Sequence, residues 1–207
     1  MKSNLTKIFD FLNTAGNLKK TIRYKSVSKI PKESVADHSW RLALMSFIIA
    51  DELKIKIDLA KAMKIALTHD LAEAITDDID ALLIHNKKIS IEAKEKAEDV
   101  AMKKLAAMLP KPAAKEIAKL WQEYLNHSSP EARYIYALDK LEAMTYLSET
   151  GHRTYGDKNH ADFIPIYADK AVTDFKKLKP VLELLKHKIK KEYKKGKFKW
   201  KKQYDKI

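Results

Sequence analysis

Apolar side chains recur along this chain every three to four residues, which is the period of an α-helix. The pattern predicts a short amphipathic helix over residues 3–13 and a nearly continuous apolar helix over residues 35–53. A third helix is expected to begin after Asp58, whose carboxylate suits an N-cap, and to run into the adjacent pair His69-Asp70.

The second half of the chain continues the helical pattern, and Ser90, Ser129 and several prolines mark where its helices begin. These helices are a short turn that ends at His85, a polar surface helix over 91–109, one that follows Pro110 and Pro112 and ends near residue 124, and one over 130–150. The remaining sequence predicts a loop over 151–165 and a final helix over 166–192, after which regular structure gives way to lysine-rich sequence.

Composition agrees with an all-α fold in one domain. The 207 residues include only four glycines and six prolines, and 45% of them are hydrophobic, which is enough for a sizeable core. The chain has no cysteine, so any metal must be held by His, Asp or Glu. The sequence has no phosphate loop of the Gly-x-x-x-x-Gly-Lys type.

The sequence also lacks the usual export and membrane signals. Met1-Lys2-Ser3-Asn4 does not lead into the apolar core of a signal peptide, and no run of about 18 apolar residues could span a membrane. We therefore expect a cytoplasmic protein.

The positive charge is concentrated at the C-terminal end. Of the formal net charge of +13, residues 176–207 contribute +11, because they carry fourteen lysines against three acidic residues. We expect residues 1–175 to form the domain and residues 176–207 to form a basic helix and tail. Lysines alternate with aromatic residues in that tail, an arrangement that can hold single-stranded nucleic acid. A solvated or partner-packed tail is the alternative that we favour.

His69 and Asp70 stand side by side at the end of a run that otherwise resembles a buried helix. Adjacent helical side chains diverge by about 100°, so one metal ion against the helix can be reached by both. Glu73 follows His69 by four residues and should share its face. A satisfied core histidine beside a capping aspartate is the simpler interpretation of the pair alone.

Two further residues could complete a metal site. His38 lies near the start of the apolar helix, and Asp139 lies in the middle of a later helix between apolar neighbours. Together with the His-Asp pair they would supply two imidazoles and two carboxylates, a set that suits Mn, Fe, Co, Ni or Zn. Taken singly, His38 could have no role and Asp139 could pair with Lys140 or Arg133.

The order His38, His69-Asp70, Asp139 resembles that of the HD-domain metal-dependent phosphohydrolases. The flanking sequences are similar to the branch that contains the 5'-deoxynucleotidases, over roughly residues 18–150; they are Glu33-Ser34-Val35-Ala36-Asp37-His38-Ser39, Thr68-His69-Asp70-Leu71-Ala72-Glu73 and Leu138-Asp139-Lys140-Leu141-Glu142.

The resemblance implies that His38, His69, Asp70 and Asp139 hold one divalent transition metal ion. It implies a homodimer that cleaves (deoxy)nucleoside 5'-monophosphates to nucleoside and phosphate. The alternatives are hydrolysis of another nucleotide phosphate or pyrophosphate by the same site, and an HD-fold protein that binds nucleic acid through its basic tail.

The resemblance also implies roles for four residues beside the metal. Glu73 matches a glutamate taken to act in proton transfer, and Arg23 matches an arginine near the phosphate. Asp78 matches an aspartate that contacts the sugar, although Asp77 stands directly before it. Some relatives carry a tryptophan, credited with favouring deoxyribose over ribose, where this chain has Tyr24, so we expect a weaker preference here.

Overall fold

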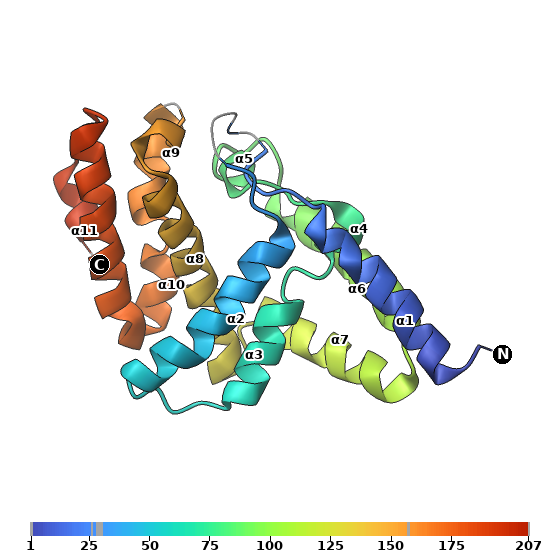
Figure 1. Cartoon of the computed structure of the whole chain (residues 1–207). Helices are drawn as coiled ribbons and strands as arrows, with labels where there is room; N and C mark the ends of the chain where they lie inside the picture. The colour runs from blue at the N-terminus through green and yellow to red at the C-terminus, as the bar shows by residue number, and fades with distance from the viewer. Residues whose placement is uncertain (1, 26, 28–30, 157, 207) are drawn as a thin grey trace.

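The computed structural model describes residues 2–25, 27, 31–156 and 158–206. In these residues the chain forms helices and no strand, which confirms the predicted all-α fold. The longer helices are α1 (Asn4–Ala15), α2 (Val35–Glu52), α3 (Leu59–Thr68), α6 (Ile91–Ala107), α7 (Lys111–Leu125), α8 (Pro130–Thr150) and α11 (Lys179–Lys195) (Figure 1). The short ones are α4 (Glu73–Thr76), α5 (Ala81–His85), α9 (Lys158–Phe163) and α10 (Asp169–Asp174).

Helices α2, α3 and α8 pack against one another in the middle of the molecule (Figure 1). Asp58 caps α3 and Ser129 caps α8, as the sequence predicts, and each side chain accepts a backbone N–H three residues ahead. At α2, Ser34 and Asp37 form a capping box. The capping box fixes the start of α2 and therefore places His38 in its first turn.

In the part of the chain that the structure describes, the buried side chains form two clusters. The larger cluster joins α2, α3 and α8 to α10 and α11, and the smaller one joins α1, α6 and α7. Ala66 belongs to the first cluster and Leu71 to the second. The pair His69-Asp70 therefore lies where the two parts of the interior meet.

The helix that leads into this pair ends sooner than predicted. α3 stops at Thr68, His69 is its C-cap, and Glu73 begins the separate helix α4. The backbone turns here through short-range bonds, because the N–H of Leu71 donates to Thr68 and that of Glu73 donates to Asp70. The expected placement of Glu73 on one helical face with His69 is therefore wrong, although both side chains line the same cavity.

The C-terminal third contains more breaks than predicted. The expected loop over 151–165 includes short 3-10 turns and α9. The expected helix over 166–192 is divided into α10, a 3-10 turn at Lys176–Leu178, and α11. Pro180 explains why α11 begins as a separate helix, because proline has no N–H to donate and fits the first turn of a helix.

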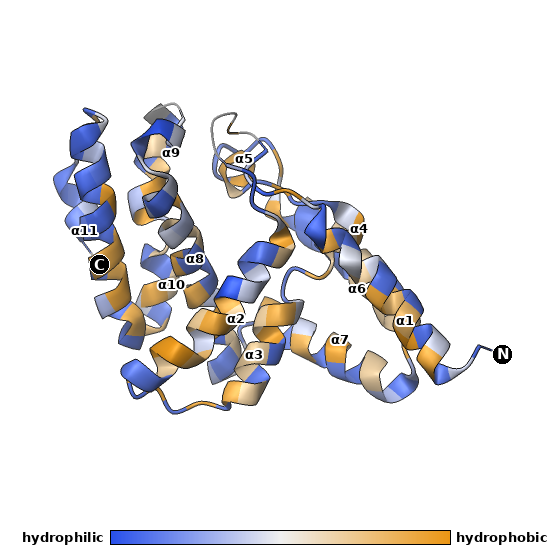
Figure 2. Ribbon diagram, viewed as in Figure 1, coloured by the Kyte–Doolittle hydropathy of each residue, from blue (hydrophilic) through white to orange (hydrophobic). Residues whose placement is uncertain are grey.

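The lysine-rich end keeps regular structure, against expectation. A 3-10 turn at Lys202–Asp205 brings Tyr204 into the interior, where it is fully buried. Phe198 and Trp200 contact the buried ring of Tyr193. Hydrophilic residues cover much of the remaining surface of α11 (Figure 2).

This C-terminal segment packs on the rest of the chain through α11, which lies along α8 and shares the larger buried cluster with it. The border expected between residues 175 and 176 stays a prediction. In the part of the chain that the structure describes, no helix combines the length and apolar character needed to cross a membrane.

Candidate metal centre and the cavity beside it

Two buried imidazoles face each other at the centre of the molecule. The Nε2 atoms of His38 and His69 lie 3.3 Å apart. Nδ1 of His69 lies 2.9 Å from the carbonyl oxygen of Ala66, and Nδ1 of His38 contacts the carboxylate of Glu142. Both Nδ1 atoms face acceptors, so a proton on each Nδ1 would leave the lone pair of each Nε2 available to a cation. In that state, a metal cation bound by both nitrogens would offset the repulsion between the two lone pairs.

Two carboxylates complete this group. Oδ1 of Asp139 lies 3.2 Å from Nε2 of His38, and Oδ2 of Asp70 lies 3.0 Å from Nε2 of His69. Ligand atoms of His38, His69 and Asp139 all fall within 4.8 Å of one another. The fold thus brings together the four residues that the sequence singled out, from α2, α8 and the turn after α3.

The two carboxylate oxygens of Asp139 face different partners. Oδ2 accepts hydrogen bonds from the Tyr124 hydroxyl at 3.0 Å and from the Lys140 ammonium at 2.8 Å, while Oδ1 faces His38. Burial alone would raise the pKa of Asp139, but Lys140 and the hydrogen bond to His38 outweigh it and hold the pKa well below its usual range. The ion pair with Lys140 and the contact with His38 therefore coexist.

The chemistry of this donor set fits a divalent transition metal ion. Imidazole nitrogens and carboxylate oxygens are suitable ligands for such ions. The charge balance agrees: burial and Arg23 lower the pKa of His38, yet Glu142 and Asp139 outweigh them and raise it to about 9. Surroundings that draw an extra proton onto a buried imidazole stabilise positive charge, which a metal ion would supply.

Glu73 lies close to the four residues but in a different setting. Its carboxylate is buried, and Oε1 lies 3.5 Å from Nζ of Lys94. Oε2 has no hydrogen-bond partner among the described residues. Burial, with the nearby Asp70 and Asp78, raises the pKa of Glu73 well above its usual range. A protonated carboxyl group at a cavity wall can give its proton to a bound molecule.

Arg23 reaches the same region from the segment before α2. A bridge between Ile22 and Ser34 holds this segment against the start of α2. Nη1 of Arg23 donates to Glu33 at 2.9 Å and to Glu142 at 3.4 Å. The two carboxylates thus hold the guanidinium in one orientation at the cavity wall.

The structure separates the two adjacent aspartates that the sequence left ambiguous. Asp77 is exposed and pairs with Lys25, whereas Asp78 lines the cavity. Oδ2 of Asp78 is buried and has no hydrogen-bond partner in the described part of the chain. Burial raises the pKa of Asp78 to about 6. Of the two, Asp78 is placed to contact a bound molecule.

Tyr24 lines the cavity beside Arg23. Its backbone has a φ of 57°, a strained value for a residue with a side chain and one that recurs at functional sites. Its ring stacks on Tyr146 with centroids 5.4 Å apart. The Tyr24 hydroxyl is buried and lacks a hydrogen-bond partner among the described residues, so it is free to pair with a hydroxyl of a bound molecule.

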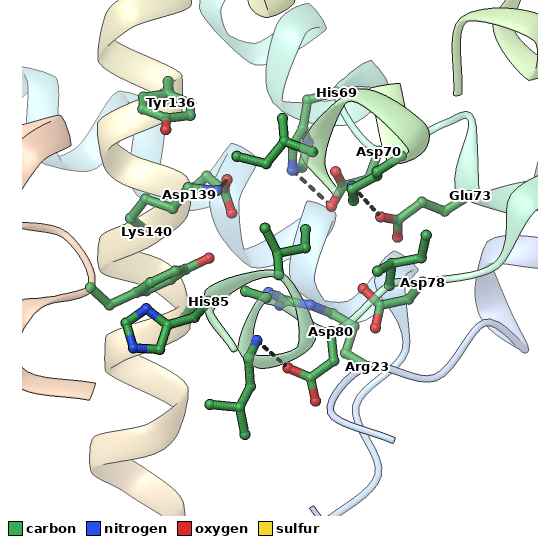
Figure 3. A pocket seen from close by; sticks show the side chains of 18 of the residues that line it. Arg23, His69, Asp70, Glu73, Asp78, Asp80, His85, Tyr136, Asp139 and Lys140 are labelled. Carbon is green, nitrogen blue, oxygen red and sulfur yellow. Dashed lines mark hydrogen bonds and ion pairs between the residues drawn. The ribbon is translucent and has the colours of Figure 1, made fainter. Parts of the chain in front are cut away.

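The cavity has a volume of about 480 Å³. Figure 3 shows His69, Asp70 and Asp139 facing the same space as Arg23 and Asp78. Among the described residues, seven acidic side chains and three lysines or arginines line it. The carboxylates in this lining disfavour a phosphate dianion, and a bound metal ion would offset part of their charge.

Two residues of the site, Arg41 and Glu142, were given no role from the sequence. Nε of Arg41 donates to Oε1 of the fully buried Glu142 at 2.6 Å. Each follows a candidate ligand by three residues, Arg41 after His38 and Glu142 after Asp139. Residues at this spacing share a helix face, and that was the available signal.

Fold and site together define a helical protein with a buried centre of histidines and aspartates beside a cavity. The chain matches the HD domain family over residues 15–182 and belongs to that family. This finding confirms the resemblance inferred from the motifs. It also extends the match beyond roughly residues 18–150, the range that contains the motifs.

Curated and solved relatives agree. 5'-deoxynucleotidase HDDC2 of Homo sapiens is 34% identical over 157 residues, which cover 74% of this chain and 70% of the relative. 5'-deoxynucleotidase YBR242W of Saccharomyces cerevisiae is 34% identical over 174 residues, which cover 79% of this chain and 70% of the relative. The crystal structure of a predicted metal-dependent phosphohydrolase from Magnetospirillum magnetotacticum is 26% identical, has a TM-score of 0.74, and matches 95% of this chain and 99% of its own.

Proposed function

We propose that this chain hydrolyses (deoxy)nucleoside 5'-monophosphates to nucleoside and phosphate with the help of one divalent transition metal ion. The observation that carries the proposal is the convergence of His38, His69 and Asp139, with ligand atoms within 4.8 Å, beside a cavity that Arg23 and Glu73 line. Membership of the HD domain family and two relatives named 5'-deoxynucleotidase support it.

We assign His38, His69, Asp70 and Asp139 as the residues that hold the ion, drawn from Mn, Co, Zn, Fe and Ni. When bound, such an ion supplies Lewis acidity toward the phosphoryl group and lowers the pKa of the attacking water. Because the cavity lining is acidic, we expect nucleotides to bind only when these four residues hold the ion.

Arg23 binds the phosphate in this proposal. Its Nη1 is held by Glu33 and Glu142, so the N–H groups of Nε and Nη2 can donate to two phosphate oxygens without reorientation. Asp78 accepts a hydrogen bond from a sugar hydroxyl through Oδ2, and Tyr24 offers its hydroxyl to the sugar as well.

Glu73 moves the proton. In this proposal Glu73 gives a proton to the leaving 5'-oxygen, because burial and the nearby Asp70 and Asp78 raise its pKa and so favour the protonated carboxyl group. A carboxyl group that loses this proton can then orient the next water molecule.

A phosphate-release assay tests the function. The chain is stripped with a chelator, reloaded with each of the five metals in turn, and given matched nucleoside 5'-mono-, di- and triphosphates and 3'-monophosphates. We expect release from 5'-monophosphates only, and only after reloading. Release of pyrophosphate, or cleavage of 3'-monophosphates at the same rate, would establish the alternative substrates instead.

The other predictions from the sequence have separate tests. The homodimer is checked by light scattering of the purified chain, and the cytoplasmic location by cell fractionation. Nucleic-acid binding by the tail is not supported by its aromatic residues, because Tyr204 is buried and Phe198 and Trp200 pack on Tyr193.

A further inference from the structure

We propose that Glu142 is a positioning residue that joins a metal ligand, His38, to the phosphate-binding arginine, Arg23, in one hydrogen-bonded unit. The inference rests on the proposed function. Glu142 is fully buried on α8, yet three nitrogen-bearing side chains converge on its carboxylate. A buried carboxylate with so many donors is held in a single orientation.

One oxygen of this carboxylate serves both partners. Oε2 of Glu142 accepts from Nδ1 of His38 and from Nη1 of Arg23, the latter at 3.4 Å. The other oxygen, Oε1, accepts from Nε of Arg41 at 2.6 Å. A movement of Glu142 would therefore displace the ring of His38 and the guanidinium of Arg23 together.

The helical spacing on α8 explains how the His38 ring is fixed. Asp139 and Glu142 are three residues apart and share a face. Asp139 contacts Nε2 of His38 at 3.2 Å, while Glu142 contacts Nδ1 of the same ring. A carboxylate that accepts the Nδ1 proton sets the tautomer in which Nε2 can bind a metal, and it makes that nitrogen more basic.

Two other glutamates provide matched controls because they share some of these partners. Glu33 pairs with Arg23 at 2.9 Å and with Arg41 at 3.3 Å, but makes no hydrogen bond or ion pair with His38 among the described residues. Glu149 is exposed and accepts from Nη1 of Arg41 at 2.7 Å. Among the described residues, Glu142 therefore contacts both His38 and Arg23, Glu33 contacts Arg23 but not His38, and Glu149 contacts neither.

The experiment compares Glu142→Gln, Glu33→Gln and Glu149→Gln. Affinity for Mn²⁺ is measured on the chelator-stripped full chain by titration calorimetry, without substrate, and KM and kcat are measured separately with a deoxynucleoside 5'-monophosphate. Loss of a residue that orients a metal ligand typically weakens metal binding about 10–100-fold, and we expect a loss of this size for Glu142→Gln, together with a higher KM.

The controls separate positioning from general stability. Glu33→Gln should raise KM while its Mn²⁺ affinity stays at that of the unmodified chain, and Glu149→Gln should change neither value. Unchanged Mn²⁺ affinity in Glu142→Gln would overturn the proposal, as would an equal loss of Mn²⁺ affinity in Glu33→Gln.

A second variant guards against misfolding. Glu142→Asp keeps the charge but draws the carboxylate back by one methylene, so it should still weaken Mn²⁺ binding; unchanged binding in this variant would also overturn the proposal. Circular dichroism confirms that each variant is folded. If the unmodified chain cleaves no nucleotide, the proposed function fails, whereas the calorimetric comparison still decides the role of Glu142.

Discussion

The centre of the molecule and the C-terminal segment, residues 176–207, both carry many charged side chains, but in opposite ways. On α8, Asp139 and Glu142 are buried, and each carboxylate is surrounded by donors. Most of the fourteen lysines of the C-terminal segment are exposed, while its buried positions are largely apolar or aromatic. A buried charge requires a partner or an ion, whereas an exposed one requires only water. The site is therefore found where charge is buried, not where charge is most abundant.

One lysine of the C-terminal segment is buried, and its contacts show a structural use. Nζ of Lys186 lies 2.7 Å from a carboxylate oxygen of Asp169 and donates to the carbonyl of Lys206 at 2.7 Å. These contacts tie the last residues and α10 to α11. Unlike the carboxylates of Glu73 and Asp78, each with a buried oxygen that lacks a partner in the described part of the chain, this group is satisfied within the fold.

The largest effect is expected from removing one of the proposed metal ligands. His69→Ala or Asp139→Ala removes one proposed ligand and leaves the other buried ligands without an ion to offset their charge. Metal content and phosphate release should therefore both fall to background. Metal is measured by mass spectrometry of the purified variants. His187→Ala, at an exposed position of α11, is the matched control and should keep both. Full metal occupancy in either site variant would remove that residue from the proposed ligand set.

The next effect in size separates Glu73 from the ligands. Glu73→Gln keeps the shape of the side chain but cannot titrate, and proton transfer by such a group contributes about 10²–10⁴-fold, so kcat should fall by that factor. Metal content should remain that of the unmodified chain. Glu183→Gln on the exposed face of α11 should change neither. A metal-free Glu73→Gln would make Glu73 a ligand, and an unchanged kcat would leave it without a part in proton transfer.

In the C-terminal segment the expected change is in stability. Tyr204 is fully buried and donates to Asp162 at 2.7 Å, so Tyr204→Ala should lower the free energy of unfolding by about 3–5 kcal/mol, as for other large buried rings. Urea unfolding measures this. Lys199→Ala, at an exposed position, should stay within about 0.5 kcal/mol of the unmodified chain. If Tyr204→Ala keeps the free energy of unfolding of the unmodified chain, or stays folded with an altered kcat, Tyr204 does not have the purely structural role that distinguishes this segment from the centre.

Local patterns predicted most of the helices and the caps at Asp58 and Ser129, while the resemblance to the HD-domain phosphohydrolases identified the residues that meet at the centre. What the sequence could not supply was pairing over long distances. Arg23 and Glu142 are 119 residues apart in the chain, and no local rule joins them. The buried role of Tyr204 was hidden for a similar reason, because it depends on a turn that folds the segment back onto α11.

The end of α3 was missed for a different reason. Apolar periodicity continues through residue 67, so it predicts a helix that also includes His69. The side chain of His69 instead turns its Nδ1 to the carbonyl of Ala66, and the following bonds span three residues rather than four. Periodicity reports which side chains are buried, but it does not report where the backbone changes its hydrogen-bond pattern.

The smallest expected effect concerns how Tyr24 reads the sugar. Its buried hydroxyl, without a partner in the described residues, can pair with a 2'-hydroxyl, and such a hydrogen bond contributes about 0.5–1.5 kcal/mol. Tyr24→Trp should therefore raise the ratio of kcat/KM for deoxyribo- over ribonucleoside monophosphates by up to about tenfold. Tyr24→Phe keeps the stack on Tyr146 and removes only the hydroxyl, so it tests hydrogen bonding apart from size. If only the tryptophan variant shifts the ratio, steric exclusion explains the selectivity; if neither does, Tyr24 does not contact the 2'-position, and its strained backbone serves the placement of Arg23 instead.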